Sequence, residues 1–155
     1  MYNFIWGNDE HQYYETICGG SGATREHDGT DAVHSHMTNT RLTDPEVLEW
    51  RFPVILESFS IRERSGGKGR KRGGNGVVRR VRFLEALKAN VLSGHREVPP
   101  YGMAGGCSGK VGINSVEHAD GSVTRLSGTD QIELKAGDVF VIETPGGGGY
   151  GIAEK

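Results

Sequence analysis

The chain has 155 residues, of which 35% are hydrophobic and 25% charged, and its formal net charge is −2. This length gives room for one domain with a single core. Its 25 glycines far exceed the usual share of about 7%, and they form short clusters rather than a strict repeat, which excludes collagen. No apolar run approaches the ~18 residues of a membrane helix, and the first four residues do not resemble a secretory signal. We therefore expect a soluble, cytoplasmic protein.

The chain contains two cysteines, Cys18 and Cys107, each inside a glycine-rich segment. Neither has a partner at the spacing of a zinc or redox motif. A disulfide between them is one alternative, but reduced thiols are the usual state of cysteines in a cytosolic chain. We expect free thiols and no metal site built on cysteine.

Positive charge is concentrated between Arg62 and Arg82, where nine Lys and Arg residues accompany a single acid, Glu63. The rest of the chain is correspondingly acidic. Such asymmetry predicts an anionic partner surface or ligand near this stretch. The alternative is a solvated hairpin whose charges contact only water.

Residues 1–30 show no clear period, although 12–23 are typical of a short strand or helix end that runs into a glycine turn. The first distinct element is a helix. Thr43 and Glu46 fit a capping box, in which the Thr hydroxyl accepts from the Glu46 N–H and the carboxylate reaches back. Pro45 is harmless in the first turn, and Pro53 ends the helix at about Phe52.

From Val54 onward the pattern is typical of β-strands. Apolar and polar residues alternate over 58–62, 80–83 and 132–134, and the alternation places Arg80 and Arg82 on one face of a strand. Residues 88–94 and 139–144 have strand character, Asp120-Gly121 predicts a two-residue hairpin between 111–118 and 122–126, and a turn is expected over 135–138.

About seven short strands with turn signals between them predict a mainly β protein with one or two short helices, arranged as a single β-sandwich or barrel-like domain. The domain spans 1–155. Within it, 1–53 form a polar, partly helical leading segment, and 54–155 form the β-rich part.

The segment 31–46 holds most of the polar chemistry. His34 and His36 are two residues apart, so on an extended segment both rings face the same side. That geometry can bind a metal with help from a nearby carboxylate, or it can hold a hydrogen-bond network in which the imidazoles contact neighbouring carbonyls. We favour the second interpretation and expect no metal.

Thr38, Asn39 and Arg41 follow, just before the helix. Such a cluster can clamp a carboxylate or an imide, because Arg forms paired hydrogen bonds and Asn is both donor and acceptor. Alternatively it closes the loop and caps the helix. Together with the two histidines, these residues are the candidate contacts to a substrate or an interface.

The glycine-rich segments suggest other sites, most of which fail on chemistry. At 104–111 a P-loop would need Gly where Ala104 stands and a hydroxyl where Val111 stands. The basic stretch 66–76 lacks the aromatic residues that stack nucleic-acid bases, so we expect no nucleic acid as a partner. Residues 146–151 form either an anion-binding nest or a flexible tail. No spacing of Ser, His, Cys and Asp indicates a catalytic triad, so the catalytic residues are unknown.

Several segments, in this order, resemble the end of the hydantoinase B/5-oxoprolinase subunit. The matching segments are 13–17, 19–23, 31–46, 65–69, 72–76, 98–102 and 137–151. The resemblance implies ATP-dependent opening of a cyclic amide, such as 5-oxoproline or a hydantoin. It also implies a hydantoinase A-type ATP-binding subunit or half as partner, and ATP and a divalent metal as cofactors of the full complex, with none bound by this chain alone. Related subunits serve in ketone carboxylases.

The chain departs from that family in length, because such subunits run to several hundred residues and this one resembles only the last part. The resemblance therefore transfers no catalytic or metal residue. We expect a truncated or split subunit, with Met1 an internal methionine of the longer protein, that is inactive without the missing N-terminal part and the ATP-binding subunit. The alternatives are a non-catalytic assembly module that docks a larger ATPase-type subunit, or part of a ketone carboxylase.

Overall fold

The computed structural model of the chain describes residues 2–35 and 38–153. Those residues form nine strands and one short helix. In chain order they are β1 (Tyr2–Gly7), β2 (Gln12–Thr16), α1 (Pro45–Arg51), β3 (Val54–Arg62), β4 (Gly76–Phe83), β5 (Leu87–Ser93), β6 (Ile113–Glu117), β7 (Val123–Leu126), β8 (Thr129–Leu134) and β9 (Val139–Glu143). The predicted mainly β composition is confirmed.

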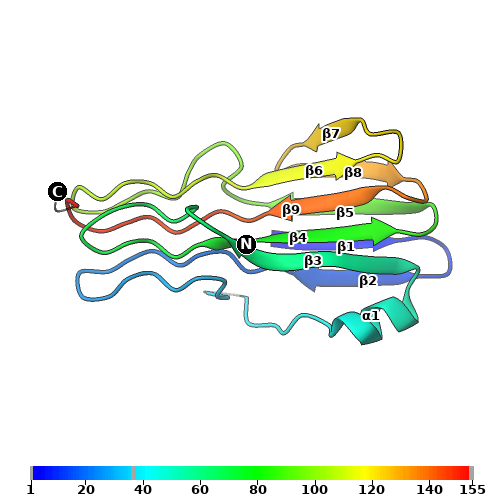
Figure 1. Ribbon diagram of the computed structural model, residues 1–155, viewed down its shortest axis with the longest axis horizontal. Helices are drawn as coiled ribbons and strands as arrows, with labels where there is room; N and C mark the ends of the chain where they lie inside the picture. Colours follow the sequence, from blue (N-terminus) through cyan, green and yellow to red (C-terminus); the bar gives the residue numbers. More distant parts are fainter. Residues whose placement is uncertain (1, 36–37, 154–155) are drawn as a thin grey trace.

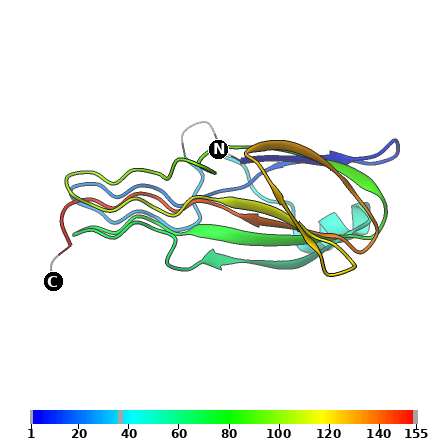
Figure 2. The same cartoon turned by 90° about the horizontal axis from the view of Figure 1, so that it is seen from above.

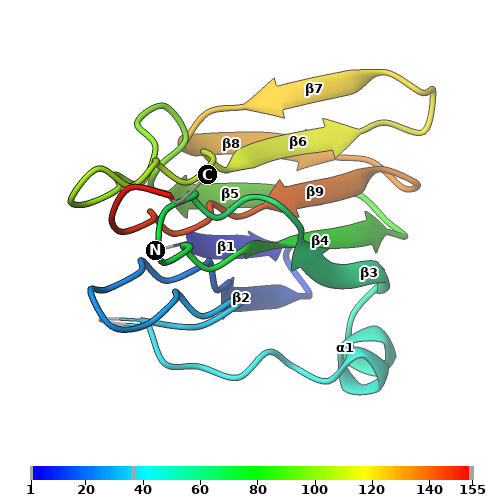
Figure 3. The same ribbon diagram turned by 60° about the vertical axis from the view of Figure 1, so that its left-hand side comes forward.

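The strands make two antiparallel sheets, one in the order β2-β1-β5-β8 and the other in the order β3-β4-β9-β6-β7. The sheets lie over one another, and α1 lies beside β2 and β3 at one edge (Figures 1 and 3). Of the two architectures predicted, the structure is therefore the sandwich. No helix among residues 2–35 and 38–153 is long and apolar enough to cross a membrane.

Strand β1 lies in a region for which the sequence showed no clear period. Its inner face carries Tyr2, Phe4 and Trp6, all buried, while Ile5 on the outer face is 45% exposed. An apolar residue on the solvent side interrupts the alternation by which a half-buried strand is identified. The strand forms because β2 pairs with it on one side and β5 on the other.

The core consists of the inner faces of both sheets, and aromatic residues join them. The rings of Phe4 and Phe140 are 4.5 Å apart between centroids, and the edge of Trp6 meets Phe83 at 5.5 Å. Offset and edge-to-face pairs of this kind are favourable beyond the area that they bury. Leu48 of α1 adds a further buried side chain.

Helix α1 begins one residue later than the capping box predicts. The N-cap is Asp44, whose Oδ1 accepts from the Glu46 N–H at 3.0 Å. The Thr43 hydroxyl instead accepts from the Tyr13 hydroxyl at 2.8 Å. The capping-box prediction was wrong at this point, because the tertiary contact to β2 takes the Thr43 oxygen.

The predicted hairpin is present, with a longer loop than expected. β6 and β7 pair from Glu117 and Val123 inward, so five residues rather than two connect them, with Gly121 at a φ of 85°. The predicted turn before β9 is confirmed, with the Asp138 N–H donating to the Lys135 carbonyl.

At one end of both sheets the chain continues into glycine-rich segments that run side by side, away from the sandwich (Figures 1 and 2). We name this part the glycine bundle and define it as residues 19–31, 65–75, 100–112 and 145–151. The segments contact one another through backbone. The Gly147 N–H donates to the Gly74 carbonyl, and the Gly149 N–H donates to the Cys107 carbonyl.

Segment 145–151 lies at the centre of the glycine bundle, and Gly146, Gly147, Gly148 and Gly149 are all buried. A Cβ on Gly146 or on Gly149 would meet segment 65–68, one on Gly147 would meet Ser21, and one on Gly148 would meet Tyr101. The direction in which a side chain would point therefore repeats every three residues, which is the period of a polyproline II helix. Glycine is required here because backbone atoms occupy each of the three directions.

The same contacts decide between the two interpretations of the last glycines. Backbone carbonyls accept the N–H groups of Gly147 and Gly149, which an anion-binding nest would need free. The Ala104–Val111 segment is similar, since Cys107 donates to the Lys68 carbonyl. Residues 146–149 are thus neither a nest nor a flexible tail, but the centre of a packed unit.

Candidate functional site

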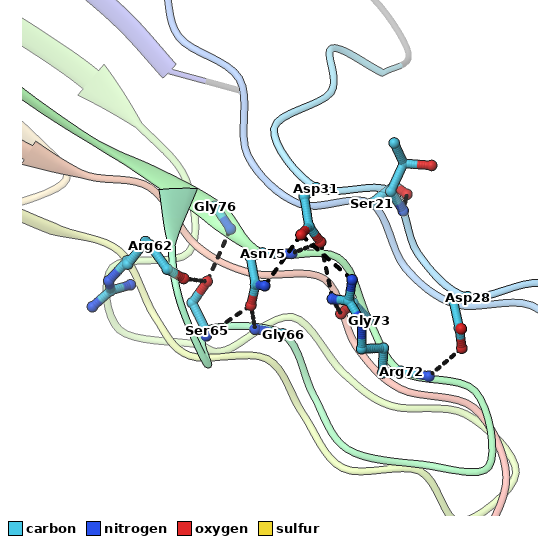
Figure 4. Close-up of polar contacts among 11 residues, drawn as sticks. Ser21, Asp28, Asp31, Arg62, Ser65, Gly66, Arg72, Gly73, Asn75 and Gly76 are labelled. Carbon is cyan, nitrogen blue, oxygen red and sulfur yellow. Dashed lines mark hydrogen bonds and ion pairs between the residues drawn. The ribbon is translucent and has the colours of Figure 1, made fainter. Parts of the chain in front are cut away.

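The polar segment 31–44 is fixed to the glycine bundle at Asp31 (Figure 4). The Arg72 guanidinium donates to both Asp31 oxygens, at 2.9 and 3.4 Å, and the Asn75 N–H donates to Oδ1 at 2.7 Å. The hydrogen bond from Arg72 outweighs partial burial and lowers the pKa of the Asp31 carboxyl. Asp31 therefore stays ionised and holds the start of the segment.

Asn75 continues this network into the bundle (Figure 4). Its Oδ1 accepts from the N–H groups of Ser65 and Gly66, both at 3.0 Å. The fully buried Ser65 hydroxyl accepts from Gly76 and donates to the Arg62 carbonyl. Every polar group of this chain of contacts has a partner, so the network positions backbone rather than offering a free ligand site.

Of the two predicted histidines, the structure describes only His34, and His36 lies outside the described residues. The Nδ1 atom of His34 is buried and has no hydrogen-bond partner among residues 2–35 and 38–153. Burial lowers the pKa of the His34 imidazole. The Nδ1 atom of His34 is thus a buried polar atom that the described part of the chain leaves unsatisfied.

The remaining predicted residues divide into exposed and anchoring groups. Asn39 and Arg41 are exposed, whereas Thr38 closes a turn by donating from its N–H and hydroxyl to the Ser35 carbonyl. The Thr40 hydroxyl contacts that of Thr16 on β2. Thr40 thus attaches the loop to the sandwich, whereas Asn39 and Arg41 are exposed to solvent.

Beneath this loop lies a buried ion pair that the sequence did not single out. Arg79 on β4 donates from Nε and Nη2 to the two carboxylate oxygens of Glu15 on β2, at 2.9 and 3.0 Å. Both side chains are almost fully buried. The sequence did hold a signal for this buried arginine. Val77, Val81 and Phe83 alternate on the core face of β4, and position 79 shares that face.

The ion pair is connected to the loop through Tyr13. The Tyr13 hydroxyl contacts both the Glu15 carboxylate, at 3.2 Å, and the Thr43 hydroxyl, at 2.8 Å. Burial raises the pKa of Glu15, an effect that the neighbouring Arg79 partly offsets, and burial likewise raises the pKa of the Tyr13 hydroxyl. A continuous polar path therefore leads from the core of the sandwich to the residue that precedes α1.

A second polar cluster lies near the far end of the sandwich. His118 contacts the Asp138 carboxylate through Nδ1 at 3.1 Å and the Thr124 hydroxyl through Nε2 at 2.8 Å. This connectivity is that of a nucleophilic triad, yet none of the three residues lines either hollow described below. Asp138 also accepts from the N–H groups of Ala119 and Lys135. The cluster ties together the loops at the ends of β6 and β9.

Two hollows of the described surface are open to solvent rather than enclosed. One, of about 850 Å³, lies over the outer face of β1 and β5, and the other, of about 660 Å³, lies along 92–98. None of the described residues of this polar segment, 31–35 and 38–43, lines either hollow. Within 2–35 and 38–153 no three His, Cys, Asp or Glu side chains come together as metal ligands. The described residues therefore offer no donor set for the divalent metal that the family resemblance implies.

The comparisons with known proteins agree with this geometry. The family model described as Hydantoinase B/oxoprolinase matches residues 1–153. The 5-oxoprolinase of Saccharomyces cerevisiae is 52% identical over 151 residues, a match that covers 90% of this chain and 11% of that protein.

Two solved structures share the fold. ATP-dependent caprolactamase from Pseudomonas jessenii superposes with a TM-score of 0.77 at 27% identity, covering 96% of this chain and 28% of its own. The nucleotide-free structure of acetone carboxylase superposes with a TM-score of 0.77 at 16% identity, and the match covers 97% of this chain and 25% of that one. The chain thus spans only a small part of the relatives that it matches. It belongs to the hydantoinase B/oxoprolinase family.

Proposed function

We propose that this chain is part of an ATP-dependent hydrolase that opens the ring amide of 5-oxoproline or a hydantoin, and that it is inactive without complementing chains. The observation that carries the proposal is the 52% identity to a 5-oxoprolinase over nearly the whole chain. The small share of that protein which the match covers supports the need for further polypeptide.

Within this proposal, the anchored segment 31–43 contacts the substrate or the adjoining chain. Its exposed Asn39 and Arg41 suit a small molecule that carries an amide and a carboxylate, because the guanidinium pairs with a carboxylate and the amide is both donor and acceptor. His34, His36 and Thr38 precede them in the sequence. Activation of the amide oxygen by ATP, before water attacks the carbon, belongs to the hydantoinase A-type partner. We assign the assembly to the cytoplasm, in keeping with the two free thiols of this chain.

The test measures ATP-dependent glutamate release from 5-oxoproline. We expect no turnover by the purified chain, and turnover once it is combined with the ATP-binding subunit and the part of its own subunit that precedes this region in the relatives. Glutamate release by the chain alone would refute the proposed dependence. Failure of the combined chains on 5-oxoproline, hydantoins and caprolactam would refute the activity.

In the combined enzyme, Arg41→Ala is expected to raise KM at least about tenfold, since a hydrogen bond to a charged group contributes about 1.5–3 kcal/mol. Arg51→Ala, on the exposed end of α1, is the matched control and should leave KM unchanged. An unchanged KM in both variants would remove Arg41 from the substrate site.

The second candidate function is that of a ketone carboxylase component, favoured by the fold shared with acetone carboxylase. It predicts ATP-dependent consumption of acetone and bicarbonate by the same combined chains. The third, a non-catalytic assembly module, predicts stable association with the ATP-binding subunit and no dependence of KM on Arg41.

A further inference from the structure

The glycine bundle ends in a compact tip made of turns that are distant in sequence. We define the bundle tip as residues 24–27, 68–71, 103–106 and 150–152. Backbone contacts join the turns, since Arg70 donates to the Gly151 carbonyl and Gly151 donates to the Met103 carbonyl. The Arg70 guanidinium also reaches the Arg25 carbonyl at 3.4 Å. In Figures 1 and 2 these turns lie at the end of the molecule farthest from the sandwich.

The structure divides the concentrated positive charge of the sequence into paired and unpaired cations. Paired with carboxylates are Arg62, Arg72, Arg79, Arg80 and Arg82. In contrast, no carboxylate of residues 2–35 and 38–153 lies within 4.0 Å of a side-chain nitrogen of Arg25, Lys68, Arg70 or Lys71. All four belong to the bundle tip. The tip therefore holds a cluster of four cations without an ionic partner among the described residues, beside the single carboxylate of Glu26, which lies near His27. Other described cations that lack a carboxylate partner, such as Arg64 and Arg125, lie outside the tip and apart from this cluster.

Exposed apolar side chains lie next to these cations. Met103 is 53% exposed and Ile152 is 76% exposed. Ile152 lies over Gly105, where a Cβ would meet its Cγ1 at 2.7 Å, so the two apolar residues sit on adjoining turns. Arg and Met are enriched in protein interfaces. A phosphate backbone would gain nothing from Met103 and Ile152, which favours a protein surface over a nucleic acid.

The tip is also held in place before any partner arrives. Its turns continue segments whose glycines, such as Gly67, Gly106 and Gly149, lie against the backbone of neighbouring segments, so few backbone conformations remain open to them. A preorganised surface loses less conformational entropy on binding than a flexible one. The cations are thus presented on a rigid support, in keeping with a docking surface rather than a solvated hairpin.

We propose that the bundle tip docks onto an acidic surface of another polypeptide of the assembly, with Arg25, Lys68, Arg70 and Lys71 facing carboxylates and Met103 and Ile152 entering an apolar depression. This inference deepens the proposed function and rests on it for the existence of a multi-chain assembly. Complementary charge speeds association and selects the partner, and its effect weakens as salt screens it.

The test compares Arg70→Glu/Lys71→Glu with the control Lys88→Glu/Arg125→Glu, which makes the same charge change on the sandwich. The probe is the ATP-binding subunit together with the remaining part of the hydantoinase B subunit. This complex is immobilised and titrated with the 155-residue chain in 50 and in 300 mM NaCl. We expect the tip variant to lose at least about tenfold in affinity and the control less than about twofold. Salt should weaken the wild type more than the tip variant. Matching melting curves establish that both variants fold.

Four outcomes would overturn the inference. The first two are an affinity of the tip variant equal to that of wild type, and no binding by wild type. The third is displacement of the bound chain by mixed-sequence RNA, which would make the tip a polyanion site. The fourth is a salt-sensitive dimer of the chain alone, which would make the partner a second copy. Binding is read without turnover. A complex that forms through the tip but hydrolyses no cyclic amide would therefore refute the proposed function and leave the docking inference intact.

Discussion

At the scale of single residues, the most consequential contact is the ion pair between Glu15 and Arg79. The two residues are far apart in the chain and lie on different sheets, so their pairing fixes how β2 sits over β4. A buried charge without its partner is costly, whereas apolar replacement of both can be neutral or stabilising.

We expect Arg79→Met alone to lower the free energy of unfolding by about 3–5 kcal/mol, because it leaves the Glu15 carboxylate buried and unpaired. Glu15→Leu/Arg79→Met should recover most of that loss. Urea unfolding of the wild type, the single and the double variant measures both effects. A single variant within about 1 kcal/mol of wild type would contradict the expectation.

The contact between Asp31 and Arg72 makes the stability of the fold depend on pH. The folded-state pKa of Asp31 is lowered by Arg72, so the contact stabilises the fold above the ordinary carboxyl pKa of about 3.9 and is lost as the pH falls through the lowered value.

The stability difference between wild type and Asp31→Asn is therefore expected to be about 1–2 kcal/mol at pH 7 and to shrink below pH of about 4. Asp9→Asn, on the exposed turn between β1 and β2, is the control. Urea midpoints at several pH values provide the measurement, and a difference that does not change with pH would contradict the assignment.

At the scale of elements, the glycine bundle has no side-chain core, and its packing depends on close approach of backbone. Gly147 and Gly22 allow a matched comparison within the bundle. A Cβ on Gly147 would lie well inside 3.0 Å of the Ser21 backbone, whereas one on Gly22 would meet its nearest atom at an ordinary 3.9 Å.

Gly147→Ala is expected to destabilise the protein by about 3 kcal/mol or more, since backbone must move. Gly22→Ala should change stability by less than about 1 kcal/mol and can stabilise by restricting the unfolded chain. Thermal melts of both variants test this. Equal effects would mean that the bundle tolerates an added methyl group.

At the scale of the whole molecule, sandwich and bundle are continuous. β4 begins where segment 65–75 ends, and β9 leads directly into 145–151. The Thr144 hydroxyl accepts from the Val77 N–H at 2.7 Å at this junction. Because the same segments serve both parts, unfolding one removes support from the other.

The chain should therefore unfold in one cooperative transition. In a Trp50→Phe background, fluorescence reports on Trp6, which is buried in the sandwich. Gly147→Ala lies within the bundle. It is expected to lower the free energy of unfolding reported by Trp6 fluorescence as much as the value reported by amide-exchange protection in 145–151. An unshifted Trp6 signal would identify two independent units.

Local patterns in the sequence were enough to predict most strands, the end of the helix, the β6–β7 hairpin, the turn before β9 and the family. Each of these depends on residues that are neighbours in the chain, such as the alternation over 80–83 or the turn at 135–138. The strand 2–7 was missed because outward-facing Ile5 interrupts the alternation, and the N-cap was misplaced because Tyr13 takes the Thr43 hydroxyl.

The sequence by itself determined the mainly β class, the polar character of 31–46 and the family. The tertiary structure alone decided that Arg79 pairs with Glu15, that the last glycines fill the centre of a bundle, and that four cations without carboxylate partners among the described residues lie together at its tip. The physical reason is distance along the chain. Contacts between residues 40 or more positions apart depend on which segments the fold places side by side, and no local pattern encodes that choice.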